Sequence, residues 1–145
     1  MDKLKKKHDQ LLKALDSLEK SLTIFKTVEQ KHCEKNKCDE EYRIHRDSII
    51  QRFEYSVDLF WKYLQKYLED ILELTESYGP KPVIRESFSA RLLNEEESES
   101  ALNMIKDRNM TSHMYVEEIA EQLAGKIPMY YQLIFDIANK IQPKK

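Results

Sequence analysis

The segment RDSIIQRFEYSVDLFWKYLQKYLE, residues 46–69, decides the fold. Its large apolar side chains recur every three or four positions, and this spacing places them along one face of a helix. The pattern predicts a helix from about Glu40 to Ser77, long enough to span a whole bundle. The predicted buried face consists of Ile49, Ile50, Phe53, Val57, Phe60, Trp61, Leu64, Leu68, Ile71 and Leu72.

A second apolar stripe precedes this segment and predicts a helix over residues 3–28. The stripe is narrow, as in the seam of a coiled-coil-like bundle. Residues 29–39 are polar, and we interpret them as a connector between the two helices. The members of the stripe are Leu4, His8, Leu11, Leu15, Leu18, Leu22 and Phe25.

The stretch YGPKP, residues 78–82, is predicted to end the long helix. Gly79 can adopt a left-handed backbone conformation, and Pro80 cannot continue the helical hydrogen bonds. A short helix is predicted from about Pro82 to Arg91. Its inward-facing side chains are predicted to be Val83, Ile84, Phe88 and Leu92.

Two further helices complete the predicted fold. Asn94 can cap a helix from about Glu95 to Ser112, and Glu97 completes a capping box. Its buried residues are predicted to be Ala101, Leu102, Met104 and Ile105. The last helix begins near Val116, and Pro128 within it predicts a kink or a brief break. Its buried face consists of Ile119, Leu123, Ile127, Tyr130, Ile134, Ile137 and Ile141.

The composition agrees with one helical domain. The chain has 145 residues, of which 41% are hydrophobic, enough for one continuous core. Only two glycines and four prolines interrupt it, which favours long helices over many short strands. We therefore predict an all-α fold: an antiparallel up-and-down helix bundle with four main helices and one short helix, in a single domain over residues 1–145.

The charge of the chain excludes a strongly basic nucleic-acid-binding protein, because the net charge is −2. The densest basic cluster lies near the amino terminus, and we interpret it as a solvated helix start. It consists of Lys3, Lys5, Lys6 and Lys7. No apolar run approaches the roughly 20 residues that span a bilayer, and no signal peptide is evident. We expect a cytoplasmic protein that does not bind membranes.

The two cysteines, Cys33 and Cys38, have His32 and His45 nearby. Their spacing matches no standard zinc pattern. We therefore predict reduced surface thiols and no metal site.

One short stretch concentrates chemically active side chains: RNMTSHMY, residues 108–115. Asn109 and His113 are four residues apart and share a face of an ideal helix, so the amide can orient the imidazole. Arg108 and His113 are about 140° apart on that helix, and they converge only if the helix ends between them. Arg108 aligns instead with Ser112.

These residue types suit phosphodiester chemistry. An imidazole can transfer protons near neutral pH, and a guanidinium can hold phosphate oxygens in a bidentate fork. Together they can support metal-independent RNA cleavage, in which the ribose 2′-hydroxyl attacks the neighbouring phosphorus. Two copies in a symmetric dimer can divide the roles of base and acid. The alternative is that both side chains only satisfy carbonyls at a helix end.

Three segments carry a family resemblance: residues 46–69, PKPVIRESFSARLL (80–93) and MIKDRNMTSHMYVEE (104–118). In this order they resemble the nucleotidyltransferase substrate-binding protein family, a branch of the HEPN superfamily. The third segment is the most specific, because it carries the Arg-x4-His motif followed by x-Tyr. The chain departs from its relatives in ARLL, which lacks a glycine often found there.

The resemblance implies a HEPN-type toxin, a homodimeric endoribonuclease without metal or cofactor. It is neutralised by a minimal nucleotidyltransferase, the antitoxin, usually encoded beside it. By position, the catalytic residues would be Arg108, His113 and Asn109, and Tyr115 would accept AMP from the partner. Thr111 and Ser112 are predicted to support the site.

Two alternatives remain open at this point. In one, the chain is a non-catalytic subunit of a two-component nucleotidyltransferase, where it binds a nucleotide or another substrate. In the other, it is a structural helical adaptor.

Overall fold

The computed structural model of the chain describes residues 2–35, 40–74 and 78–144, with side chains for all of these except 32–35. Within these ranges every regular element is helical, so the predicted all-α fold is confirmed. The elements are α1 (Asp2–Lys35), α2 (Glu40–Asp70), α3 (Pro80–Ser89), α4 (Glu95–Asn109), the 3-10 helix η1 (Met110–His113) and α5 (Glu117–Lys140).

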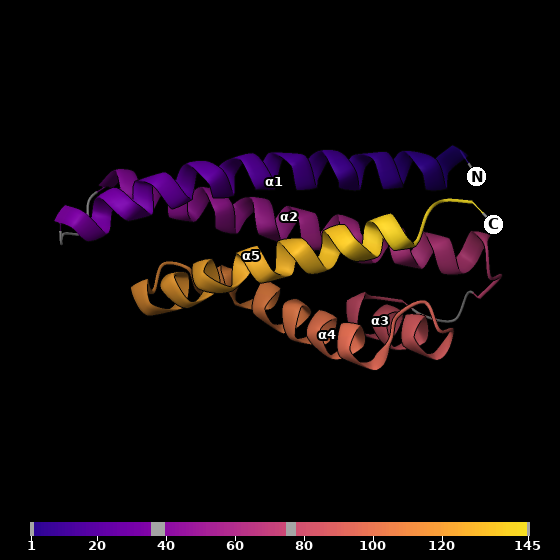
Figure 1. Cartoon of the computed structure of the whole chain (residues 1–145). Helices are drawn as coiled ribbons and strands as arrows, with labels where there is room; N and C mark the ends of the chain where they lie inside the picture. The colour runs from indigo at the N-terminus through magenta and orange to yellow at the C-terminus, as the bar shows by residue number, and fades with distance from the viewer. Residues whose placement is uncertain (1, 36–39, 75–77, 145) are drawn as a thin grey trace.

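The helices form an antiparallel bundle (Figure 1). Helices α1 and α2 run in opposite directions along each other for most of their length. Helix α5 packs on both of them, and α4 runs back against α5. The short α3 packs between the carboxyl-terminal half of α2 and α4. As a result, α1 begins and α5 ends at the same end of the bundle.

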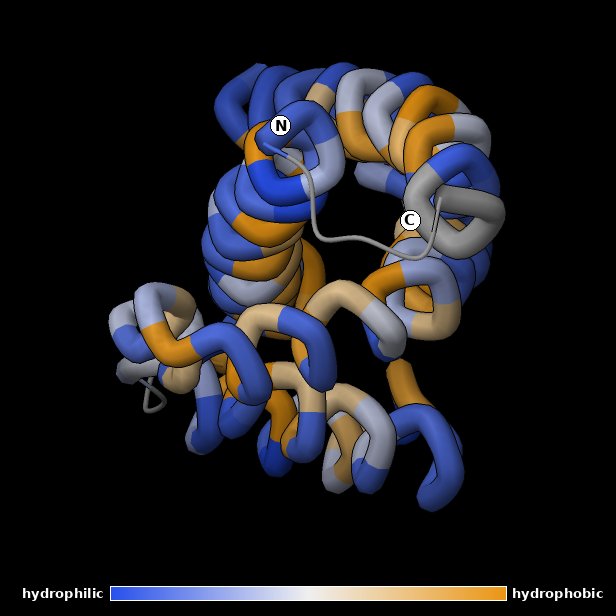
Figure 2. Tube along the Cα trace, turned by 90° about the vertical axis from the view of Figure 1, so that its left-hand side faces the viewer, coloured by the Kyte–Doolittle hydropathy of each residue, from blue (hydrophilic) through white to orange (hydrophobic). Residues whose placement is uncertain are grey.

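The buried residues form one cluster to which every α-helix contributes. Apolar residues line the inner sides of the helices, largely as predicted from the stripes on α1, α2 and α5 (Figure 2). The exception on α2 is Leu72, which was predicted to be buried but lies beyond the end of the helix and is exposed. Phe53 of α2 stacks on Tyr130 of α5, with ring centroids 5.6 Å apart. Because each fully buried large apolar side chain contributes about 1.5–3 kcal/mol, this cluster is the main source of stability.

Two polar side chains in the core tie the end of α5 to α1 and α2. His8 lies on the predicted stripe of α1 and is buried, and its Nε2 donates to the carbonyl of Ala138 at 2.8 Å. Tyr63 of α2 donates its hydroxyl to the carbonyl of Ile141 at 2.5 Å. The hydrogen bonds satisfy groups that would otherwise be costly to bury.

The ends of α1 and α2 differ from the prediction. Helix α1 continues to Lys35 instead of ending near residue 28. The burial of Val28 and the contact of Phe25 with Tyr42 hold this part of α1 against the start of α2. Helix α2 ends at Asp70 instead of Ser77. The amide of Leu74 folds back to the carbonyl of Leu68 at 2.8 Å, which satisfies a terminal carbonyl at this earlier stop.

Gly79 therefore caps a different helix from the predicted one. It has φ of 93° and precedes the first residue of α3, Pro80. Helix α3 thus begins two residues earlier than predicted. A proline at the first helical position is favourable because its missing amide hydrogen has no helical partner there.

The carboxyl-terminal end of α3 is a Schellman motif built on a residue other than glycine. The amide of Leu92 donates to the carbonyl of Ser87 at 2.9 Å, and the amide of Arg91 donates to that of Phe88 at 3.0 Å. Arg91 has φ of 65°, a conformation that favours glycine. The helix ends at Ser89, and Phe88 is 45% exposed, so its predicted inward position was wrong.

The start of α4 confirms the predicted capping box. The side chain of Asn94 accepts from the amide of Glu97, and the side chain of Glu97 accepts from the amide of Asn94. Helix α4 ends at Asn109, where η1 replaces the last predicted turn. The sequence predicted a kink or a brief break at Pro128. Helix α5 is continuous through this residue, so the break does not occur.

The prediction of reduced surface thiols concerns Cys33 and Cys38, which lie outside the residues whose side chains the structure describes. In the described part of the chain, no group of three or more His, Cys, Asp or Glu side chains could hold a metal ion. A search of the same residues for a helix long and apolar enough to cross a bilayer finds none.

Candidate functional site

The stretch 108–115 forms the corner between α4 and α5. Its backbone changes at Met110 from an α-helix to the 3-10 helix η1, which ends at His113. A 3-10 helix advances about 120° per residue, so side chains three residues apart share a face and side chains four apart do not. This change decides which of the motif side chains meet.

Arg108 points to α2 rather than to solvent. Its Nε and Nη2 donate to the two carboxylate oxygens of Asp58, both at 2.9 Å. Glu54, one turn earlier on α2, lies 3.5 Å from Nη1. The hydrogen bonds to Asp58 and its charge raise the pKa of Arg108 further, despite partial burial. Arg108 is therefore a bidentate clamp between α4 and α2.

Thr111 completes this clamp from the 3-10 helix. It is buried, and its hydroxyl lies within hydrogen-bond reach of the carboxylate of Glu54 and of the Arg108 carbonyl, the latter at 2.8 Å. Arg108 Nη1 in turn donates to the Thr111 hydroxyl at 3.4 Å. Both side chains can reach the same carboxylate because they are three residues apart where α4 passes into the 3-10 helix η1, and residues at this spacing share a face.

Asn109, Ser112 and His113 are exposed. No hydrogen bond joins Asn109 to His113 in the structure, so the predicted orientation of the imidazole by this amide does not occur. The reason is the 3-10 geometry, which turns the two side chains about 120° apart. Arg108 aligns with Thr111, not with Ser112, whose hydroxyl makes only a long contact of 3.5 Å to the carbonyl of Asn109.

Tyr115 is the most exposed large aromatic residue of the corner. Its side chain is 80% exposed, and among the described residues the only ring it approaches is that of His113, with centroids 6.2 Å apart. Val116, which precedes α5, makes no capping hydrogen bond through its side chain. The corner therefore presents a phenol and an imidazole side by side to solvent.

A second ion pair fixes the other side of the corner. Arg46 of α2 is only 2% exposed and donates from Nη1 and Nη2 to the two carboxylate oxygens of Glu117, the first residue of α5. Its ring neighbour Tyr42 donates to Glu121, one turn further along α5. A buried guanidinium is stable only when paired in this way.

These contacts change the pKa values of two side chains at the corner, Glu117 and Tyr42. The hydrogen bond from Arg46 lowers the pKa of Glu117 below its ordinary value. Burial raises the pKa of the Tyr42 hydroxyl, and the bond to Glu121 raises it further. The carboxylate of Glu117 therefore stays charged, and the corner is clamped to α2 on both sides of Tyr115.

Comparison with known proteins agrees with this architecture. A family model described as nucleotidyltransferase substrate binding protein like matches residues 6–142. The chain belongs to the nucleotidyltransferase substrate-binding protein family. A comparison with curated proteins finds no match.

Two solved structures resemble this family member. A protein from Thermus thermophilus is 33% identical with a TM-score of 0.73, and the alignment covers 89% of this chain and 96% of that one. A protein from Haemophilus influenzae is 20% identical with a TM-score of 0.74, over 91% of this chain and 96% of that one. The latter structure is described as the fold of a substrate-binding domain of a nucleotidyltransferase, and at this identity it shows a shared fold alone.

The α2 side of the site in this family member was not predicted from the sequence. Glu54 and Asp58 are four residues apart, and this spacing alone places both carboxylates on one face of α2. The spacing of these two carboxylates was visible in the sequence. Their pairing with Arg108 was not, because no local pattern shows which helix faces α4. Arg46 was likewise visible only as one charge in a helix start.

The charges around Arg108 do not favour a polyanion. Glu54 and Asp58 outnumber this one guanidinium on the α2 side, whereas Arg43 and Arg46 balance Glu117 at the start of α5. An RNA phosphate approaching Arg108 would have to displace Asp58 and approach Glu54. The predicted grip of Arg108 on phosphate is therefore occupied by carboxylates in this chain.

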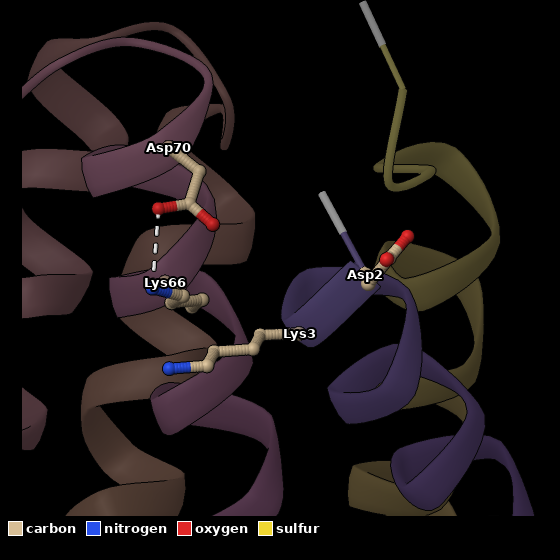
Figure 3. A pocket seen from close by; sticks show the side chains of 4 residues that line it. All are labelled: Asp2, Lys3, Lys66 and Asp70. Atoms are coloured by element: carbon tan, nitrogen blue, oxygen red, sulfur yellow. Dashed lines mark ion pairs between the residues drawn. The ribbon is translucent and has the colours of Figure 1, made fainter.

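Lys3 of the amino-terminal lysine cluster lies among balanced charges. A hollow of about 550 Å³ separates the start of α1 from the end of α2. Figure 3 shows Lys3 reaching across it toward α2, where Lys66 is paired with Asp70 at 3.2 Å. Asp2 and Asp70 balance the two lysines that line the hollow. The interpretation of this end as a solvated helix start agrees with that balance.

Proposed function

We propose that this chain is the substrate-presenting subunit of a two-component nucleotidyltransferase. In this proposal, the corner between α4 and α5 is presented to a separate catalytic subunit, and Tyr115 accepts the nucleotidyl group. The observation that carries the proposal is the exposure of Tyr115 on a corner clamped on both sides, by Arg108 to Asp58 and by Arg46 to Glu117. Membership of the family supplies the partner class.

The clamps give the proposal its physical basis. Transfer requires that the phenolic oxygen approach the α-phosphorus of a nucleoside triphosphate in line with the departing pyrophosphate. The new bond joins the phenolic oxygen to phosphorus, the bond to the β-phosphate breaks, and a base of the catalytic subunit takes the phenolic proton. A corner held at both ends presents this oxygen with little loss of entropy on binding.

A hollow beside the corner supports the idea that another protein approaches here. It measures about 590 Å³ and lies between Met114 and the outer face of α2, including Ile44, Gln51 and Glu54. Ile44, Met110 and Val116 leave apolar surface exposed near the same corner. An interface core commonly consists of such apolar side chains within a polar surround.

The ribonuclease hypothesis places the same residues in different roles. His113 is exposed, as a general acid or base must be, but Arg108 is bound by Asp58 and faces Glu54. Cleavage would require this guanidinium to leave a bidentate partner. The geometry therefore favours presentation over RNA cleavage; the HEPN placement, the RNA substrate and the homodimer remain predictions.

Mass spectrometry after incubation with the catalytic nucleotidyltransferase subunit and ATP tests the proposal. We expect one nucleotidyl adduct on the wild-type chain and none on Tyr115→Phe. Tyr55→Phe and Tyr78→Phe are matched controls, because both tyrosines are also exposed. An adduct that persists in Tyr115→Phe, or no adduct on any chain, would contradict the proposal.

A parallel assay addresses the ribonuclease hypothesis. Purified chain is incubated with total RNA, alongside His113→Ala. RNA cleavage that His113→Ala abolishes would establish the ribonuclease interpretation in place of presentation alone. We expect the same low background of cleavage for both proteins.

A further inference from the structure

A groove between α1 and α5 lies away from the motif. It measures about 460 Å³, and Leu22, Phe25 and Ala124 contribute apolar surface to it. Glu19 and Glu29 line it together with one cation, Lys26. Nothing in the proposed role of Tyr115 uses this surface.

Helix α5 contains two helix-disfavouring residues at this groove. Gly125 and Pro128 both lie inside the helix and both line the groove. Glycine costs more backbone entropy than any other residue in a helix, and proline removes a hydrogen bond. A local sequence that opposes its own helix in this way marks a functional surface when packing does not explain it.

Internal packing does not require the glycine. A Cβ atom built on Gly125 meets no atom within 4 Å, so no neighbouring side chain in the described part of the chain requires glycine there. Pro128 has no amide hydrogen for the carbonyl of Ala124, four residues earlier. The groove therefore has an open backbone surface at Gly125 and, beside it, a carbonyl without its helical donor.

We propose that this groove is the docking site for a basic amphipathic helix of the catalytic nucleotidyltransferase subunit. The inference rests on the proposed function, because the occupant is that same subunit. A helix that lays its apolar face into a groove is a common mode of recognition, and a glycine at the groove allows a close approach.

The charges of the groove select a basic occupant. Two carboxylates, Glu19 and Glu29, line the groove against the single cation of Lys26. Glu19 is already oriented, because it accepts a hydrogen bond from the Tyr131 hydroxyl at 2.6 Å. A lysine or arginine of the occupant can pair with Glu29 while its apolar neighbours cover Leu22 and the open surface at Gly125.

The position of the groove suits an enzyme that acts on Tyr115. Gly125 lies eight residues after Glu117, the first residue of α5. At about 1.5 Å per residue, the groove is roughly 12 Å along α5 from the corner. A domain of about 100 residues has a radius of gyration near 13 Å, so one docked subunit can span both places.

Binding of the catalytic nucleotidyltransferase subunit tests the inference, measured by isothermal titration calorimetry. Gly125→Leu places a leucine side chain in the groove, where the space beside Gly125 is open. Leucine also has a higher helix propensity than glycine. We expect at least a tenfold weaker affinity together with an unchanged or higher melting temperature, which excludes unfolding as the cause. Asn139→Leu adds the same side chain to an exposed position near the other end of α5, away from both the groove and the corner, and we expect unchanged affinity.

The outcomes separate this inference from the proposed function. Unchanged affinity in Gly125→Leu, or equal losses in both variants, overturns docking in the groove and leaves presentation of Tyr115 intact. No complex with the wild-type chain overturns both. A homodimer of the wild-type chain that Gly125→Leu dissociates in sedimentation would assign the groove to a second copy and overturn the inference as well.

Discussion

The clamp between Arg108 and Asp58 can be tested by Asp58→Asn, which removes one charge and keeps the size of the side chain. Hydrogen bonds to charged groups contribute about 1.5–3 kcal/mol when buried. Here the side chains are 26% and 34% exposed, so solvent reduces the value. Glu54 remains 3.5 Å from the guanidinium and keeps part of the attraction. We therefore expect a loss of about 1–2 kcal/mol in the free energy of unfolding.

Urea unfolding followed by Trp61 fluorescence and by circular dichroism measures this loss. For a chain of this size, 1 kcal/mol corresponds to roughly 2–4 °C in melting temperature, so the expected fall is about 2–8 °C. Asp16→Asn is the matched control, because Asp16 pairs with Lys20 at the same distance of 2.9 Å but on an exposed surface. We expect no measurable change for this control.

A double-mutant cycle decides whether the two residues act as a pair. Arg108→Gln and Asp58→Asn are combined, and the coupling free energy is expected to be about 1 kcal/mol or more. Amide exchange of residues 110–114 should accelerate in both single variants, because the clamp holds η1 on α2. Additivity of the two losses to within about 0.5 kcal/mol would refute the clamp.

Three further predictions concern stability. Arg91→Gly should raise the free energy of unfolding by about 0.5–1 kcal/mol in thermal unfolding, because Arg91 has φ of 65° at the end of α3; a loss would contradict this account of the Schellman motif. The lowered pKa of Glu117 stabilises the fold at pH above its ordinary value of 4.5, and this stability is lost as the pH falls through the lower folded pKa. Glu117→Gln should therefore flatten the acid side of a plot of melting temperature against pH, and an unchanged slope would argue that Arg46 does not hold this carboxylate in solution. Asn94→Ala should cost about 1 kcal/mol by removing the capping box of α4, and urea unfolding should show no loss if the box is dispensable.

Features that depend on short stretches of sequence were predicted closely. The capping box of Asn94 and Glu97 involves residues three apart, and the structure contains both of its hydrogen bonds. The stripe of α1 placed even His8 correctly in the core. Such features follow from the 3.6-residue period and from local hydrogen bonds, so the sequence alone carries them.

Helix ends and motif geometry depended on distant contacts. Helix α1 extends beyond its predicted end, and only the tertiary structure shows that Phe25 packs on Tyr42 at the start of α2. The change to a 3-10 helix at Met110 turned Asn109 away from His113 and brought Thr111 to the carboxylate of α2. The sequence showed that ARLL lacks a glycine. Only the structure showed that Arg91 has a positive φ there, a backbone conformation that is unfavourable for a residue other than glycine.

The sequence by itself determined the order of the α-helices and most of their inner faces, and it placed Arg108, His113 and Tyr115 at one corner, because these properties depend on residues close together in the chain. Only the tertiary structure decided that Arg108 is bound by a carboxylate 50 residues away, that Tyr115 stands exposed, and that Gly125 and Pro128 share a groove with α1. Those properties arise where separate helices meet, and the partner of a charge or a cavity is set by how the helices pack rather than by the residues beside it in the chain.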